Sequence, residues 1–293
     1  MGKIQQEIDE YLKMGGGDDL NDNIMKTAFG VKGLGMPLGG IKQNILRLTP
    51  NTLQKFQRDM IHPENIYVCA AGIDNHSDFV QFVKTQLSFI QPPSIKPLQR
   101  EPSEYFGGEF INDVGAEEAT VALAFKTVSW KEKDIYTFQV LNTLLGSSAS
   151  FSTGGPGKGM HSRATKNLLN RLSYVDSANA LCTCFSDTGL FGLILSGPST
   201  NANELLRSTM DEIKLLADPI PAIELQRAKN ITKSNILMAL ERQKDRLEES
   251  VKNVRDLVYI CLESLNRLKR LEDLLSMNIV RILTKSQQIM LIR

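Results

Sequence analysis

One glycine-rich stretch, residues 144–163, constrains the fold of this chain more than any other feature. It holds five of the 21 glycines of the 293-residue sequence. Apolar residues at helical spacing lead into it from Ile135 to Leu145. Glycine is costly to order and Pro156 lacks a backbone donor, so a helix cannot continue through the stretch. We therefore expect a loop between a helix over 131–145 and another over 160–170, serving either as a flexible linker or as a backbone surface that contacts another molecule.

A phosphate-binding loop is the first alternative for such a stretch. That motif has Gly, four residues, then Gly-Lys-Ser/Thr, and it lies between a strand and a helix. Here Gly157 and Lys158 are followed by Gly159, and Ser152 occupies the position of the first glycine. The preceding element is a predicted helix, so the pattern disfavours nucleotide binding.

The stretch resembles a known family. Phe151-Ser-x-Gly-Gly-Pro-Gly-Lys-Gly-Met160, followed by Ser162-Arg163, is similar to the glycine-rich loop of the family that contains the α-subunits of the mitochondrial processing peptidase and core protein 2 of the cytochrome bc1 complex. Two earlier turns, Leu34-Gly-Met-Pro37 and His62-Pro-Glu-Asn65, also resemble that family. The resemblance implies that the loop contacts presequence peptides. The substrate-binding residues expected from it are Phe151, Gly154, Gly155, Pro156, Gly157, Lys158, Gly159 and Met160.

Composition limits the classes of partner. The formal net charge is +1, which gives no global case for binding nucleic acid. No apolar run reaches the roughly 20 residues of a membrane span. Cys69, Cys182, Cys184 and Cys261 fit no zinc spacing, and Cys182 and Cys184 share one face of a predicted strand. Reduced, buried thiols are the expected state of these cysteines.

The order of elements after residue 100 predicts an α+β fold. Alternation predicts strands over 108–114 and 119–125, then over 174–186 and 189–197 with a hairpin turn at Thr188-Gly189, and a closing strand over 288–292. Helical spacing predicts helices over 201–216 and 221–240 and a helical stripe over 247–265. We expect an antiparallel sheet with helices on one face, in processing-peptidase-like lobes.

Residues 1–95 have a different pattern. A helix is predicted to end near Phe29, and another to begin at Pro50 with Thr49 as its N-cap, burying Leu53, Phe56 and Met60. A strand is predicted over 66–71, followed by a helix capped by Ser77.

A proline-rich segment over 91–97 predicts the domain boundary. Residues 1–95 resemble the C-terminal half of a first peptidase-like lobe, and residues 96–293 resemble a complete, inactive second lobe with its glycine-rich loop at 146–160. A half-lobe leaves a sheet edge and an apolar face uncovered, so we expect another polypeptide to supply the missing half, or the gene product to be split.

The sequence lacks the zinc-binding motif that peptidase chemistry in the wider family requires. Catalysis in the wider family depends on an inverted zinc motif, His-x-x-Glu-His. Neither His62, His76 nor His161 has a Glu and a second His at that spacing. We expect no catalytic residue, no metal and no cofactor in this chain. The resemblance implies that the zinc lies in a partner β-subunit.

Two functions follow from the resemblance. The first is a non-catalytic α-type subunit that recognises presequences, as a matrix-side core subunit of respiratory complex III. The second is a purely structural core protein 2. The expected partners are a β-type processing-peptidase or core 1 subunit, cytochrome b and other complex III subunits, and presequence peptides, with no nucleic acid. The expected location is mitochondrial, on the matrix side of the inner membrane.

Overall fold

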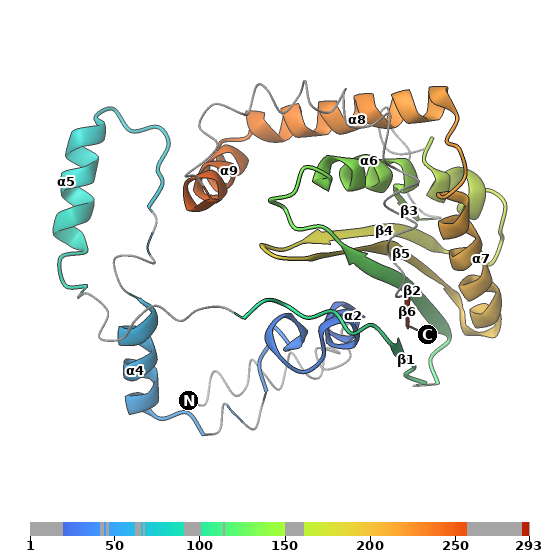
Figure 1. Ribbon diagram of the computed structural model, residues 1–293, viewed down its shortest axis with the longest axis horizontal. Coiled ribbons are helices and arrows are strands. Elements are labelled where there is room, and N and C mark those ends of the chain that lie inside the picture. Colours follow the sequence, from blue (N-terminus) through green and yellow to red (C-terminus); the bar gives the residue numbers. More distant parts are fainter. Residues whose placement is uncertain are drawn as a thin grey trace. The chain divides into compact units, whose positions relative to one another are not determined.

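The computed structural model of the chain describes residues 20–41, 44, 47–61, 66, 68–90, 101–113, 115–149, 161–256 and 289–292 (Figure 1). These residues form two compact units. Unit 1 comprises the described residues within Met1–Gly39, Pro102–Ser234 and Leu268–Arg293, and unit 2 those within Gly40–Glu101 and Asn235–Arg267.

Unit 1 is built on one six-stranded sheet. Its strands are β1 (Glu109–Phe110), β2 (Glu118–Thr127), β3 (Ser147–Ala149), β4 (Ser177–Cys184), β5 (Gly189–Pro198) and β6 (Ile289–Ile292). The order across the sheet is β1-β6-β2-β5-β4-β3, and every neighbouring pair is antiparallel except β1 and β6. The predicted hairpin is confirmed: Cys184 pairs with Gly189, and the Phe185 N–H donates to the Thr188 carbonyl at 2.7 Å.

One face of the sheet packs against two helices that lie between its strands in sequence. Phe191 of β5 lies 5.5 Å from Phe125 of β2 and 5.4 Å from Phe138 of α6 (Ile135–Leu145), between ring centroids. Leu205 of α7 (Ala202–Leu215) packs with Val121 of β2 in a second buried cluster. Such aromatic and aliphatic burial is the main stabilisation of a layered domain.

Helix α8 (Ala222–Glu241) lies over α6, and a hydrogen bond joins them. The Thr232 hydroxyl of α8 donates to the Thr143 hydroxyl of α6 at 2.8 Å. The helix predicted over 160–170 is confirmed as η3 (Ala164–Leu169), which has the wider π-helical winding.

The opposite face of the sheet is covered by α2 (Leu20–Phe29). Ile24, Ala28 and Phe29 are buried against Ala122 and Ala124 of β2. Alternate residues of a strand point to opposite faces, so these two alanines lie opposite Val121 and Phe125. The α+β fold class is confirmed, and α2 adds a helix on the face opposite α6.

Unit 2 contains α4 (Pro50–Met60), α5 (His76–Gln86) and α9 (Gln243–Asp256). Thr49 caps α4 as predicted, accepting a hydrogen bond from the Thr52 N–H at 3.2 Å. The predicted cap of α5 is wrong: Asn75, not Ser77, is the N-cap, and its side chain accepts from the Ser77 N–H at 2.9 Å. Asn75 lies two residues before Ser77, and its side chain can accept a hydrogen bond from the unpaired backbone N–H groups at the start of the helix.

Two further expectations in unit 2 are wrong. Leu53, Phe56 and Met60 were expected to be buried but are 52%, 60% and 37% exposed, and no residue of α4 is buried. The described residues between 66 and 71 form no strand. A strand is stabilised by pairing with a neighbour, and no other strand lies in the described part of unit 2.

Some predicted features lie outside the described residues. These are the proline-rich segment over 91–97 and the helical stripe beyond residue 256. The division at residue 95 therefore stays a prediction. Among the described helices, none is both long and apolar enough to cross a membrane.

Candidate functional site at the base of the glycine-rich loop

The eight predicted substrate-binding residues, from Phe151 to Met160, lie outside the described residues. The structure does describe the two segments that flank them. Strand β3 leads toward the loop, and His161, Ser162 and Arg163 lead away from it. These flanking segments form the base of the loop.

The two flanks meet at Gly146 and Ser162. Gly146 ends α6 with a φ of 73°, a conformation that favours glycine, and a Cβ added there would collide with the Ser162 side chain. The Gly146 carbonyl accepts a hydrogen bond from the Ala180 N–H of β4 at 2.9 Å. Ser162, which follows the loop, therefore packs against the residue at which α6 ends and β3 begins, and this contact holds the two flanking segments together.

Ser162 is buried and organises the first turn after the loop. Its hydroxyl accepts from the Thr165 N–H at 3.3 Å and lies 3.1 Å from the Thr165 hydroxyl. Such a contact satisfies a backbone donor at the start of a helical segment. It fixes where η3 begins, directly after the loop.

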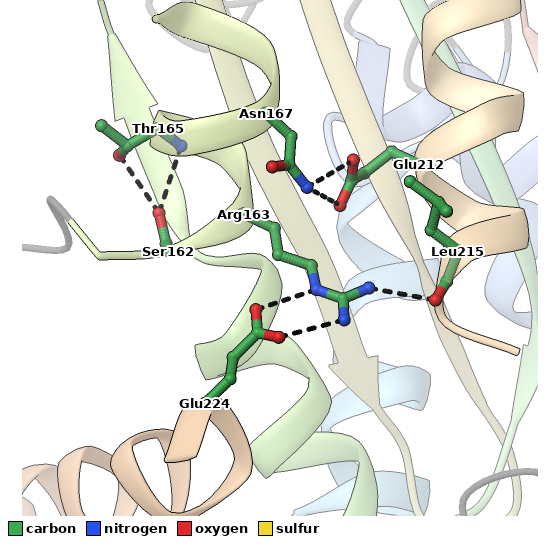
Figure 2. A network of polar contacts seen from close by, with 7 residues as sticks. All are labelled: Ser162, Arg163, Thr165, Asn167, Glu212, Leu215 and Glu224. Atoms are coloured by element: carbon green, nitrogen blue, oxygen red, sulfur yellow. Dashed lines mark hydrogen bonds and ion pairs between the residues drawn. The ribbon is translucent and has the colours of Figure 1, made fainter. Parts of the chain in front are cut away.

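Arg163, three residues after the loop, joins the start of η3 to α7 and α8. Its Nε donates to Oε1 of Glu224 at 3.0 Å and its Nη2 donates to Oε2 at 3.2 Å, a bidentate pair with the first turn of α8. Its Nη1 donates to the Leu215 carbonyl at the end of α7 at 3.1 Å. Figure 2 shows the guanidinium between the two partners. Bidentate pairs of this kind combine strength with a fixed orientation, so Arg163 ties the exit of the loop to α7 and α8.

A second polar pair lies beside the first. The Asn167 amide donates at 3.1 Å to each carboxylate oxygen of Glu212, which is only 3% exposed (Figure 2). Burial raises the pKa of Glu212, while the hydrogen bond from Asn167 and the charge of Arg163 act in the opposite direction. The carboxylate is thus held inside unit 1 by a donor from η3.

The loop emerges from the edge of the sheet. Strand β3 is the last strand in the order, and among the described residues it pairs with β4 alone. An edge strand offers unpaired backbone donors and acceptors along its outer side. The strand that leads into the loop therefore has an outer side with which an extended peptide could pair.

The described residues contain no cluster of three or more His, Cys, Asp or Glu side chains that could hold a metal ion. Of the histidines, His76 begins α5, His161 is an exposed residue directly after the loop, and His62 lies outside the described residues.

Sequence reasoning missed the partners of Arg163. The residue was part of the motif, but nothing in the sequence paired it with Glu224, which is 61 positions away. Glu224 and Glu212 lie on helices that read as ordinary amphipathic segments. Only the position of Glu224 in the first turn of a predicted helix set it apart from other acidic residues.

Fold and site define a class: an α+β domain in which a glycine-rich stretch of sequence follows the edge strand of a largely antiparallel sheet. The family described as the peptidase M16 inactive domain matches residues 47–232. The chain belongs to this family, and the predicted resemblance is confirmed.

Curated relatives of the chain are α-subunits of the mitochondrial processing peptidase. The probable subunit alpha-1 of Arabidopsis thaliana is 33% identical over 210 residues, covering 71% of this chain and 41% of the relative. The potato subunit alpha is 30% identical over 247 residues, covering 82% and 47%. The human subunit alpha is 26% identical over 237 residues, covering 76% and 45%. The chain thus spans less than half the length of these relatives.

Solved structures share the fold. A chain of complex III2 from Candida albicans superposes with a TM-score of 0.80 at 15% identity, covering 98% of this chain and 69% of that one. A protease from Helicobacter pylori superposes with a TM-score of 0.80 at 18% identity, covering 99% and 70%. At these identities the likeness establishes the fold alone.

Proposed function

We propose that this chain is a non-catalytic α-type subunit of a mitochondrial processing peptidase and that its glycine-rich loop recognises presequences. The observation that carries the proposal is the closed base of the loop, in which Gly146 meets Ser162 and Arg163 ties the exit to two helices. The names of the curated relatives support the same role. Membership of the inactive M16 family fits a subunit without catalysis of its own.

The base explains how a glycine-rich loop can bind with useful affinity. A free glycine segment loses much conformational entropy when it orders on a peptide. Fixing both ends of the loop removes part of that cost before binding. The backbone donors and acceptors of the loop then pair with an extended peptide, as an added strand does.

The residues proposed to contact the presequence divide by chemistry. The glycines at 154, 155, 157 and 159 offer main chain, while Pro156 limits the number of loop conformations. Phe151 and Met160 are apolar anchors at the two ends, and Lys158 binds a carbonyl, a carboxylate of the peptide or an acidic group of a partner.

The chemistry of cleavage is assigned to a partner. In this proposal a β-type subunit holds the zinc, and the pair lies on the matrix side of the mitochondrial inner membrane with cytochrome b and other complex III subunits. The fold shared with a chain of complex III2 supports this setting. The same likeness favours the second candidate, a purely structural core protein 2 without a presequence role.

Deletion of residues 154–159 tests recognition. In the complex with the β-type subunit, the deletion is expected to weaken presequence binding at least about tenfold, which corresponds to about 1.4 kcal/mol. Assembly should stay intact, because the loop base lies outside the deleted residues. A matched control replaces the same six positions with alternating Gly and Ser, which keeps loop length but removes Pro156 and Lys158. Unchanged processing kinetics in the deletion variant would leave only the structural role.

The partners are tested separately. Affinity purification of the tagged full chain from mitochondria, followed by native electrophoresis and mass spectrometry, should recover a zinc-bearing β-type subunit together with cytochrome b. Recovery of the β-type subunit without cytochrome b would support a processing peptidase outside complex III. Recovery of cytochrome b without processing activity would support the structural core protein.

A further inference from the structure

Strand β3 forms the edge of the sheet that lies directly before the glycine-rich loop. Ser147, Ser148 and Ala149 pair with β4 on one side. Among the described residues, no strand pairs with the other side of β3, and the main chain makes no hydrogen bond there. A sheet edge of this kind can accept an extended peptide as one more strand.

The hydrogen bond at Gly146 fixes which backbone groups of β3 face outward. The Gly146 carbonyl accepts from the Ala180 N–H of β4, so the backbone groups of Gly146 face β4. In an antiparallel pair, these groups point alternately toward the partner strand and away from it. The N–H and C=O of Ser148 therefore face β4, whereas those of Ser147 and Ala149 face outward.

The side chains of β3 leave this outer side open to another backbone. Natural edge strands are protected against pairing by charged side chains, proline or bulges, and β3 has none of these. Ser147 and Ala149 are small and exposed, so a second strand can approach to the usual spacing of about 4.8 Å. The opposite edge of the sheet differs, because β1 carries the exposed, charged residue Glu109.

We propose that the presequence adds to the sheet as a strand antiparallel to β3, paired with the main chain of Ser147 and Ala149. This inference rests on the proposed function and extends it from the loop to the strand before it. Each of the two residues exchanges both of its main-chain hydrogen bonds with the peptide residue opposite it. The antiparallel direction follows that of β3, β4 and β5, and it is the slightly more stable pairing.

The pairing defines the chemistry of the peptide. Two alternate peptide residues need a free backbone N–H, which excludes proline at both positions, while the residue between them directs its N–H away from the sheet. Phe151 lies two residues beyond Ala149 in the sequence, a reach of at most about 7 Å. A peptide on β3 is therefore within reach of the first proposed anchor of the loop.

Single backbone N-methylations along a fluorescent synthetic presequence peptide test the pairing in the complex with the β-type subunit. N-methylation removes one N–H and places a methyl group between the two strands. At the two positions opposite Ser147 and Ala149, binding measured by fluorescence anisotropy should weaken at least about tenfold. N-methylation of the residue between them should leave the affinity unchanged, which gives an alternating pattern along the peptide.

Ala149→Pro tests the same pairing from the side of the chain. Proline is tolerated on an edge strand where its missing N–H faces outward, and this variant should bind the peptide at least about tenfold more weakly. Glu109→Pro, at the first residue of the opposite edge strand, is the matched control and should bind as the unaltered chain does. Fluorescence of Trp130, the single tryptophan of the chain, reports whether each variant keeps unit 1 folded.

The inference is overturned if N-methylation at every position is tolerated, or if the sensitive positions are adjacent instead of alternate. If Ala149→Pro does not fold, the N-methylation series on the unaltered complex decides the question. The deletion of residues 154–159 separates this inference from the proposed function. Binding that is lost in the deletion but kept in folded Ala149→Pro overturns only the pairing with β3. If the unaltered complex binds no presequence peptide, the proposed function fails as well.

Discussion

Replacing Arg163 by Met tests whether the ion pair between Arg163 and Glu224 stabilises unit 1. The substitution keeps an unbranched side chain but removes all three hydrogen bonds to Glu224 and Leu215. It leaves the carboxylate of Glu224 without its cation and the Leu215 carbonyl without its donor.

The expected loss of unfolding free energy follows from how deeply the ion pair is buried. The side chains of Arg163 and Glu224 are 10% and 25% exposed. Removing one partner of a fully buried pair costs about 3 to 5 kcal/mol, because a buried charge stays uncompensated. Since Glu224 keeps some contact with water, we expect the lower end, about 3 kcal/mol of unfolding free energy. For a chain of this size that corresponds to a fall of about 6 °C or more in Tm.

Lys214→Met is the matched control on the neighbouring helix. Lys214 pairs with Asp211 at 3.5 Å, and the two side chains are 70% and 72% exposed. Exposed pairs contribute about 0 to 1 kcal/mol, so this variant should lose less than about 0.5 kcal/mol. Both variants undergo the same change from a basic residue to Met, and they differ in burial.

Urea unfolding followed by Trp130 fluorescence measures the stability of unit 1. The variant Arg163→Met/Glu224→Met supplies the last comparison, since it removes both charges and should recover at least half of the loss. Equal unfolding free energies for Arg163→Met and Lys214→Met would refute the argument. So would a double variant whose loss equals the sum of the two single losses.

Two other perturbations probe the same base. Gly146→Ala places a side chain at positive φ against Ser162 and should lower the free energy of unfolding by about 2 to 3 kcal/mol. Gly33→Ala, at φ 54° but with open space around it, is the control and should lower it by about 1 kcal/mol. Equal losses in urea unfolding would contradict the contact between Gly146 and Ser162. Burial raises the folded-state pKa of Glu212 above its ordinary 4.5, so the folded chain binds this proton more tightly than the unfolded chain. Stability contributed by the neutral acid is present below about pH 4.5 and is lost as pH rises through the raised pKa, so Glu212→Gln should gain stability relative to its parent between pH 4 and pH 8. A stability difference that does not change with pH would contradict the assigned burial effect.

Local features of the fold were predictable because short-range chemistry fixes them. The Thr188-Gly189 turn joins two apolar runs, and β4 and β5 pair across it as expected. Thr49 before Pro50 predicted the start of α4, since capping depends on three or four neighbouring residues. Asn75 and Ser77 can both cap a helix, so the sequence pattern left the start of α5 ambiguous by two positions.

Long-range pairings decided what local patterns could not. The strand predicted over 66–71 failed because a β-branched run needs a neighbouring strand, and the described part of unit 2 provides none. Conversely, β6 at Ile289–Ile292 pairs between β1 and β2, so two strands close in sequence are not neighbours in the sheet.

The sequence by itself determined the α+β class and the family to which the chain belongs. Each of these depends on residue types at short, fixed spacings. Tertiary structure alone decided that α2 covers the second face of the sheet and that Arg163 finds Glu224 across 61 residues. The physical reason is that burial and ion pairing depend on distances in space, which a linear pattern of residues does not contain.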